Sequence, residues 1–176
     1  RIFFPSNGDS GASESDQINI LGNHVGSYSA AVGYHFPTWK VKAYWEHFFE
    51  DRSGMTLTYG MWRDCLTGLE VTLPENPFVK TVVGEFLYTK HQSGAFHYFA
   101  TPAIDHSFTG ADNYYNNSQY AGWEHWGQGI GNPLVMSPIY NDDGEIIFKS
   151  NRLQGHHFGI MGTPCTDLEY RILLSF

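Results

Sequence analysis

The sequence predicts an all-β protein whose strands form an antiparallel sheet of the kind found in transmembrane β-barrels. The clearest evidence is segment 168–176, which alternates between apolar and polar side chains apart from Leu173. Successive side chains of a strand point to opposite faces, so this segment has one apolar and one polar face. Segment 26–36 repeats the pattern, with small or polar residues on its second face. Strands of about ten residues with these two faces suit a wall between lipid and water.

The composition is poor in charge and rich in aromatic residues, and it excludes two classes of protein. Charged and aromatic residues each make up 16% of the 176 residues, whereas about a quarter of an average protein is charged. There is no run of about 18 apolar residues, which excludes a helical membrane span. The net charge of −8 argues against a nucleic-acid partner, which would require a basic surface.

The two-residue period recurs along the chain. In the second predicted strand, Trp39 and Val41 alternate with Lys40 and Lys42. The six predicted strands cover about 26–36, 39–50, 68–73, 79–89, 154–161 and 168–176. The residues that we expect to face lipid are Tyr28, Val32, Trp39, Val41, Val71, Leu168, Ile172 and Leu174.

The predicted connections alternate in length. They are short at 37–38, 74–77 and 162–166 and long at 51–67 and 89–152. Outer-membrane barrels likewise combine short periplasmic turns with long extracellular loops. Six strands cannot close a membrane barrel, because the smallest have about eight and open edges would leave backbone groups unpaired in lipid. The chain also begins without a signal peptide and ends inside a strand, so we expect an internal fragment of a longer, processed polypeptide.

The segment 89–152 is an aromatic-rich loop region within a single predicted domain, 1–176. It contains a turn signal at 141–144 and a predicted minor strand at 146–148. Loops of this length are usually functional or disordered, and the aromatic content argues against disorder. A shorter loop is expected near the start of the chain, with 18–21 as a possible short strand.

Several motifs resemble the Wzi-type capsule assembly proteins of Bacteroides-like bacteria. Three of them lie in the long loop, as Asp-Asn-Tyr-Tyr-Asn at 112–116, Gly-Trp-Glu-His-Trp-Gly at 122–127 and Gly-Ile-Gly-Asn-Pro-Leu at 129–134. The segments 22–24, 44–51, 68–74, 89–94, 151–152 and 156–157 fit the same family. The likeness therefore covers nearly the whole chain.

The resemblance implies a fold and a function. It implies an outer-membrane β-barrel of roughly eighteen strands in a Gram-negative cell. This chain would be the central-to-C-terminal third of that barrel. Proteins of this family hold capsular or exopolysaccharide at the cell surface. The implied partners are therefore this polysaccharide, outer-membrane lipid and other capsule-export proteins. The family offers no catalytic residues and no cofactor, so no enzyme activity is expected.

An aromatic cluster in the long loop is the candidate binding site for polysaccharide. Its members are Tyr114, Tyr115, Tyr120, Trp123, Glu124 and Trp126. Aromatic rings can stack on the apolar faces of sugar rings, while polar neighbours bind hydroxyl groups. The alternative is that the rings pack the loop or form an interfacial aromatic belt. Trp123 and Trp126 would share one face of a helical turn but oppose each other in an extended strand.

Metal, disulfide and nucleotide chemistry have little support. His156 and His157 are neighbours on a predicted strand, so they point to opposite faces and cannot jointly bind one ion. Cys65 and Cys165 have no zinc spacing, and their pairing in a disulfide stays open. The glycines of 127–131 lack the strand-to-helix context of a nucleotide-binding loop.

Two further functions remain open, and a third is disfavoured. The same wall could belong to a porin or a glycan-uptake channel, because a fold does not determine a function. The apolar faces could instead pack in a soluble β-sandwich that binds carbohydrate. A catalytic carboxylate pair is disfavoured, because a charged interior is usual for a membrane barrel. The carboxylates concerned are Glu46, Glu50, Glu70 and Glu85.

Overall fold

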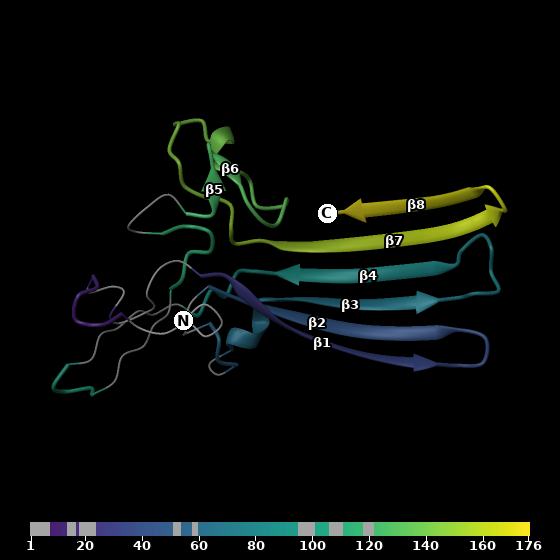
Figure 1. Ribbon diagram of the computed structural model, residues 1–176, viewed down its shortest axis with the longest axis horizontal. Helices are drawn as coiled ribbons and strands as arrows, with labels where there is room; N and C mark the ends of the chain where they lie inside the picture. Colours follow the sequence, from purple (N-terminus) through teal and green to yellow (C-terminus); the bar gives the residue numbers. More distant parts are fainter. Residues whose placement is uncertain are drawn as a thin grey trace. The chain divides into compact units, whose positions relative to one another are not determined.

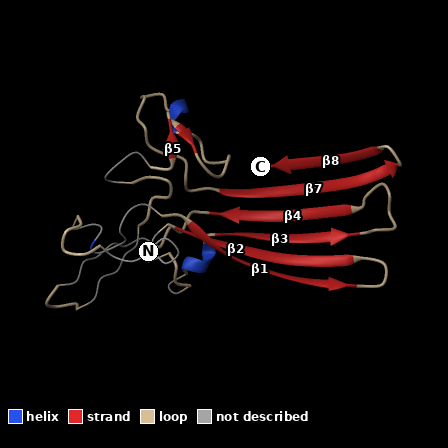
Figure 2. Cartoon of the chain, in the orientation of Figure 1, coloured by secondary structure: helices blue, strands red, loops and turns tan. Residues whose placement is uncertain are grey.

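The main element of the computed structural model is a six-stranded antiparallel sheet in the order β1-β2-β3-β4-β7-β8 (Figure 1, Figure 2). The structure describes residues 8–13, 17, 24–50, 54–57, 60–94, 101–105, 111–117 and 122–176. The strands of the sheet are β1 (Gly26–His35), β2 (Lys40–Phe49), β3 (Cys65–Thr72), β4 (Thr81–Tyr88), β7 (Gln154–Cys165) and β8 (Leu168–Ser175). Among the described residues, no helix is long and apolar enough to cross a membrane.

Smaller elements occur in the connections. The strands β5 (Glu124–His125) and β6 (Gln128–Gly129) form a separate hairpin. The connections also contain two short 3₁₀ turns, η1 (Met61–Arg63) and η2 (Pro138–Tyr140). The sequence pattern did not predict the hairpin, because each of its strands has only two residues.

The six long strands predicted from the two-residue period are confirmed, but the predicted turn at 162–166 is wrong. Strand β7 continues to Cys165, and the chain turns at 166–167. Pro164 lies within an irregularity of the β7–β8 ladder, between Gly162 and Cys165. A strand tolerates proline at such a position because the missing N–H interrupts no regular ladder hydrogen bond. The possible strand at 18–21 lies outside the described residues.

Strand register gathers apolar side chains on one face of the sheet. Directly opposed residues of an antiparallel pair lie on the same face. A row of β-branched residues therefore crosses five strands, in the order Val41, Val71, Val82, Ile160 and Ile172. Among the residues expected to face lipid, Val41, Val71, Leu168, Ile172 and Leu174 share this apolar face. Their contact with lipid stays a prediction.

Aromatic rings flank the β-branched row toward both ends of the strands. Near the short turns, the Phe36 and Trp39 rings stack with centroids 3.9 Å apart. Toward the other end, the ring centroid of His156 lies 5.0 Å from that of Phe86 and 5.6 Å from that of Phe176. The apolar face thus has an aliphatic middle and aromatic margins.

The opposite face is polar. Its row nearest the short turns consists of Lys40, Thr72, Thr81, Met161 and Arg171. A row nearer the long connections consists of Tyr44, Gly68, Glu85, His157 and Ser175. His157 bonds Ser175 on this face, whereas His156 opposes Phe86 on the apolar face. The prediction that the two histidines point to opposite faces is confirmed.

Two tyrosines cover glycines on adjacent strands. Tyr44 lies over Gly68, where an added Cβ would come 2.1 Å from the ring Cζ. The Tyr44 hydroxyl reaches beyond β3 and donates to the Glu85 carboxylate. On the apolar face, a Cβ added at Gly162 would come 2.0 Å from the Phe78 carbonyl oxygen and 2.7 Å from the Tyr170 ring. Each glycine provides the space for a side chain that links neighbouring strands.

Contacts divide the chain into two compact units, which follow the alternation of strands and long connections. The sheet unit consists of Ser27–His47, Cys65–Tyr88 and Gln154–Phe176. The loop unit consists of Arg1–Gly26, Phe48–Asp64 and Thr89–Leu153. The predicted aromatic-rich region 89–152 falls within the loop unit, which also contains the described residues of the predicted polysaccharide site.

Candidate functional site

A buried polar network centred on Asp64 joins separate segments of the loop unit. The Asp64 side chain is almost fully buried. Its Oδ1 accepts the N–H of His91 at 2.8 Å, and its Oδ2 accepts the N–H of Gln92 at 2.6 Å. Oδ2 also accepts the hydroxyl of Tyr114 at 2.7 Å. A buried carboxylate needs such donors, because they offset its loss of hydration.

Gln92 and Asn151 extend this network. The Gln92 Nε2 donates to the carbonyls of Thr89 and Asn151 at 2.9 and 3.1 Å, and its Oε1 accepts the N–H of Tyr114 at 3.3 Å. The Asn151 Nδ2 donates to Asn113 Oδ1 at 2.6 Å and to the Tyr114 carbonyl. Three motifs that are distant in the sequence therefore meet in one polar core.

Two of the tyrosines predicted to contact polysaccharide are packed within the loop unit. Tyr114 is 5% exposed, which leaves no open ring face for a sugar. Burial, with the charge of Asp64 and the hydrogen bond to it, raises the pKa of Tyr114 above its ordinary range. The N–H of the half-buried Tyr115 donates to the Glu50 carboxylate, and its hydroxyl accepts the N–H of Asn132 at 3.0 Å.

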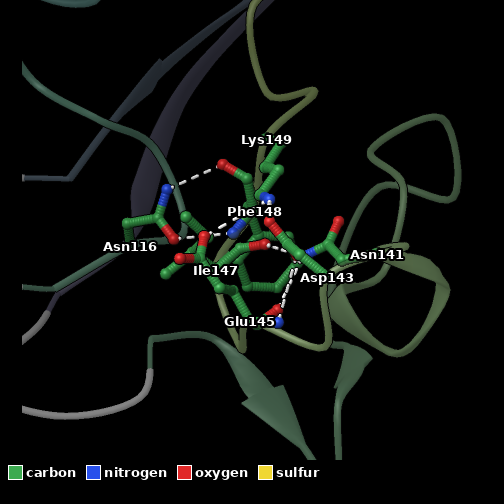
Figure 3. Close-up of polar contacts among 7 residues, drawn as sticks. All are labelled: Asn116, Asn141, Asp143, Glu145, Ile147, Phe148 and Lys149. Atoms are coloured by element: carbon green, nitrogen blue, oxygen red, sulfur yellow. Dashed lines mark hydrogen bonds and ion pairs between the residues drawn. The ribbon is translucent and has the colours of Figure 1, made fainter.

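Side-chain amides replace a neighbouring strand beside residues 145–148 (Figure 3). The Asn116 Nδ2 donates to the Phe148 carbonyl at 2.9 Å, while its Oδ1 accepts the Phe148 N–H at 2.8 Å. The Asn141 Nδ2 donates to the carbonyls of Glu145 and Ile147, both at 2.7 Å. These bonds satisfy the backbone without a partner strand. The predicted strand at 146–148 is therefore wrong.

Trp126 lies at the tip of the β5–β6 hairpin. Both residues of the two-residue turn have positive φ, +54° at Trp126 and +78° at Gly127. This combination characterises a type I′ turn, in which Asn or Gly usually occupies the first position. The carboxylate of Glu124 accepts the Gly127 N–H and closes the turn. Trp126 is 85% exposed, so this hairpin presents a large aromatic ring in a backbone conformation that disfavours it.

Trp123 is placed differently from Trp126. It is half-buried, its N–H donates to the Tyr115 carbonyl at 2.8 Å, and its carbonyl accepts the Ile130 N–H at 2.8 Å. Its indole Nε1 is buried and has no hydrogen-bond partner among the described residues. The two tryptophans therefore occupy the base and the tip of one hairpin, not a helical turn. Tyr120, the remaining member of the predicted site, lies outside the described residues.

Tyr140 is an exposed aromatic residue that the sequence reasoning did not select. It ends η2, whose middle residue Ile139 donates its N–H to the Gly127 carbonyl at 2.8 Å. This bond holds η2 against the hairpin turn that carries Trp126. Tyr140 is 70% exposed. No periodic pattern marks it, because its position depends on the contact between the turn and η2.

The carboxylates, cysteines and possible metal ligands considered from the sequence can also be placed in the structure. Glu85 accepts a hydrogen bond from Tyr44, and Glu50 accepts one from Tyr115. Cys65 and Cys165 do not form a disulfide. Among the described residues, no group of three or more His, Cys, Asp or Glu side chains is arranged to hold a metal ion.

Comparisons of the chain with models of protein families, with curated proteins and with solved structures found no match.

Proposed function

We propose that this chain forms part of the wall of an outer-membrane β-barrel that holds capsular or exopolysaccharide at the surface of a Gram-negative cell, without turnover. The two-faced sheet supports the architectural part of the proposal. Its apolar face has an aliphatic row between aromatic margins, as expected where a barrel wall crosses lipid between two aromatic girdles. The edge strands β1 and β8 would pair with further strands to close the barrel.

The observation that carries the polysaccharide part is the exposed Trp126 ring on a strained turn. A bulky residue at positive φ costs about 1–3 kcal/mol, and such residues cluster at functional sites. Tyr140 is linked to the same turn through Ile139 and Gly127, which provides a second exposed ring. Flat aromatic faces of this kind can stack on the apolar faces of sugar rings. We therefore centre the glycan contact on Trp126 and Tyr140.

Capsule attachment in cells tests the proposal. Trp126→Ala, alone and with Tyr140→Ala, should reduce the polysaccharide retained on cells while leaving barrel assembly, read as heat-modifiable gel mobility, unchanged. Trp62→Ala is the matched control, because Trp62 is a half-exposed tryptophan in η1 of the same unit. Full retention in the well-assembled double variant would remove these rings from the site.

A diffusion or uptake channel is the second candidate, because a polar face with lysines, glutamates and a histidine would line an aqueous lumen. Planar-bilayer conductance separates the two functions. A wide open pore together with normal capsule retention in a deletion strain would favour the channel. Low conductance together with lost retention would favour polysaccharide anchoring.

A soluble β-sandwich is the third candidate. It would require a second sheet over the apolar face, and the second sheet of the described part consists of two strands of two residues each. Val32 on β1 is 73% exposed. Monodisperse monomeric protein in buffer without detergent would nevertheless overturn the membrane proposal.

A further inference from the structure

A groove of about 230 Å³ lies on the polar face of the sheet, over β1, β2 and β3. Its β1 side is lined by Ala31, Gly33 and His35. Ala31 and Gly33 are small, which leaves open space beside the longer side chains of the neighbouring strand. The other lining residues are Lys40, Val41, Lys42, Glu70 and Thr72. All of these residues belong to the sheet unit.

Positive charge predominates in this groove. Lys40 and Lys42 are two residues apart on β2, so they extend from the same face. Among the described residues, neither lysine forms an ion pair within 4 Å, although Glu70 lies directly opposite Lys42 in the register. The nearest contact described for the Lys42 ammonium is the Tyr44 ring, 5.4 Å from its centroid. Two cations therefore face one anion.

The charged residues of the polar face differ in their partners. Lys40 belongs to the row next to the short turns, which also contains Arg171. The Arg171 guanidinium is already paired with the Glu169 carboxylate, 3.0 Å away. Glu85 lies two rows farther along, where Tyr44 donates a hydrogen bond to it. Among the described residues, Lys40 and Lys42 form no such ion pair, so their charges remain available to an anion in the groove.

We propose that this groove binds the carboxylate or phosphate group of an acidic saccharide, with Lys40 and Lys42 as the charged donors. Ammonium groups bind both kinds of anion through charge-assisted hydrogen bonds. The choice of a saccharide rests on the proposed function, and it deepens that function by naming an acidic polysaccharide as the substrate class. The preference for an anion rests on the groove alone.

Equilibrium binding to the purified protein in detergent tests this site, with glucuronate, glucose 6-phosphate and neutral glucose as probes. Both anions should bind at least about tenfold more tightly than glucose, and their affinity should fall as salt rises. The double variant Lys40→Gln with Lys42→Gln should weaken anion binding by about 10- to 100-fold, because it removes both charge-assisted donors of the groove.

A second variant tests the groove by volume, not by charge. Ala31→Leu should fill the space beside the lysines and weaken anion binding while leaving both cations in place. Lys80→Gln is the matched control, because Lys80 precedes β4 and does not line the groove. Folding of each variant is checked by heat-modifiable mobility.

The outcomes separate this site from the polysaccharide contact on the loop unit. Equal binding of glucose and glucuronate, or unchanged anion binding in both folded groove variants, would overturn the anion site. Trp126→Ala should leave glucuronate binding unchanged. Suppose that Trp126→Ala loses capsule attachment while the groove variants bind anions normally. The proposed function would then be supported, and the anion site in the groove would be rejected.

Discussion

At the scale of single residues, buried polar side chains order the loop unit by serving as backbone partners. Buried backbone N–H and C=O groups require hydrogen bonds, which regular strands provide and irregular loops lack. Asp64 and Gln92 supply acceptors and donors to the backbone of neighbouring segments, and Asn116 forms a paired contact with Phe148. These polar side chains, which resemble ligand-binding groups in the sequence, thus bind the backbone of neighbouring loops.

Tyr114→Phe should loosen the loop unit. The change removes one hydrogen bond to a buried carboxylate, which is worth about 1.5–3 kcal/mol. We expect faster amide hydrogen exchange at His91 and Gln92, whose N–H groups bond the same Asp64 carboxylate. Tyr140→Phe is the control, because that tyrosine is largely exposed. Equal exchange in both variants would show that the hydroxyl of Tyr114 contributes nothing to this core.

The stability of the same core should depend on pH through Tyr114. Its pKa in the fold is raised, chiefly by burial, above the ordinary value of about 10. The folded state therefore keeps a proton that the unfolded state releases, and the stabilisation is complete below pH of about 10 and is lost as pH rises beyond it. Hydrogen exchange at alkaline pH should show this loss, and Tyr114→Phe should diminish it. An identical pH profile in the variant would contradict the assignment.

Trp126→Asn should stabilise the hairpin and weaken capsule attachment. Asn before Gly is the preferred pair for a type I′ turn, so the change relieves the positive φ of tryptophan, by about 1 kcal/mol. Slower exchange of the Ile130 amide, which donates to the Trp123 carbonyl across the hairpin, measures the stabilisation. A trade between stability and binding is expected where a strained residue serves function. Unchanged attachment with a stabilised hairpin would show that the strain has another origin.

At the scale of secondary-structure elements, the tyrosine–glycine pairs fix how neighbouring strands fit together. Gly68→Ala should destabilise the sheet by about 1–3 kcal/mol, because its Cβ would overlap the Tyr44 ring and force local rearrangement. Gly84→Ala is the matched control on β4, where an added Cβ meets nothing within 4 Å. Urea unfolding of the protein in detergent compares the two variants.

A double-mutant cycle identifies the cause of the Gly68 effect. If the Tyr44 ring is the obstacle, Gly68→Ala should cost much less in a Tyr44→Ala background than in the wild type. Independent effects of the two changes would mean that backbone conformation, and not the ring, requires glycine at this position.

The sequence predicted the long strands well, because a sheet with one apolar face makes apolar and polar residues alternate along each strand. It failed at β7, since Gly162 and Pro164 normally signal a turn but here occupy an irregular ladder. It also missed β5 and β6, which are too short to show a period. In the candidate site, the sequence alone does not distinguish Tyr114 from Trp126, because both are aromatic residues of the same loop region. Only the tertiary contacts with Asp64 and the turn geometry show that one is buried and the other exposed.

At the scale of the whole molecule, the two units differ in how the sequence specifies their structure. The sheet unit is specified by binary patterning, which repeats along each strand and tolerates local exceptions such as Val83 and Leu87 on the polar face. The loop unit is specified by individual polar residues that cannot be exchanged without leaving a buried partner unsatisfied. Substitutions in the sheet should therefore depend on the face they occupy, whereas those in the loop unit should depend on the particular bond they break.

A pair of substitutions on β4 tests the membrane wall. Val82 and Val83 are adjacent valines, both half-buried, but Val82 belongs to the β-branched row of the apolar face and Val83 opposes Glu70 on the polar face. If the apolar face meets lipid, Val82→Arg should cost about 2–4 kcal/mol and reduce the folded protein in the outer membrane. Val83→Arg should cost less than about 1 kcal/mol, because its charge faces water and an opposing carboxylate.

The comparison between these two variants separates the membrane wall from its rivals more sharply than either variant alone. Arginine at Val82 is harmful both in lipid and in the core of a soluble sandwich, so the environment in which the cost appears must be measured. In a barrel, the wild type needs detergent or lipid to remain monodisperse, and the Val82→Arg variant fails at membrane assembly. In a sandwich, the wild type stays folded in buffer, and the same variant unfolds there. Equal tolerance of arginine at both valines would exclude both arrangements, because neither face would then be removed from water.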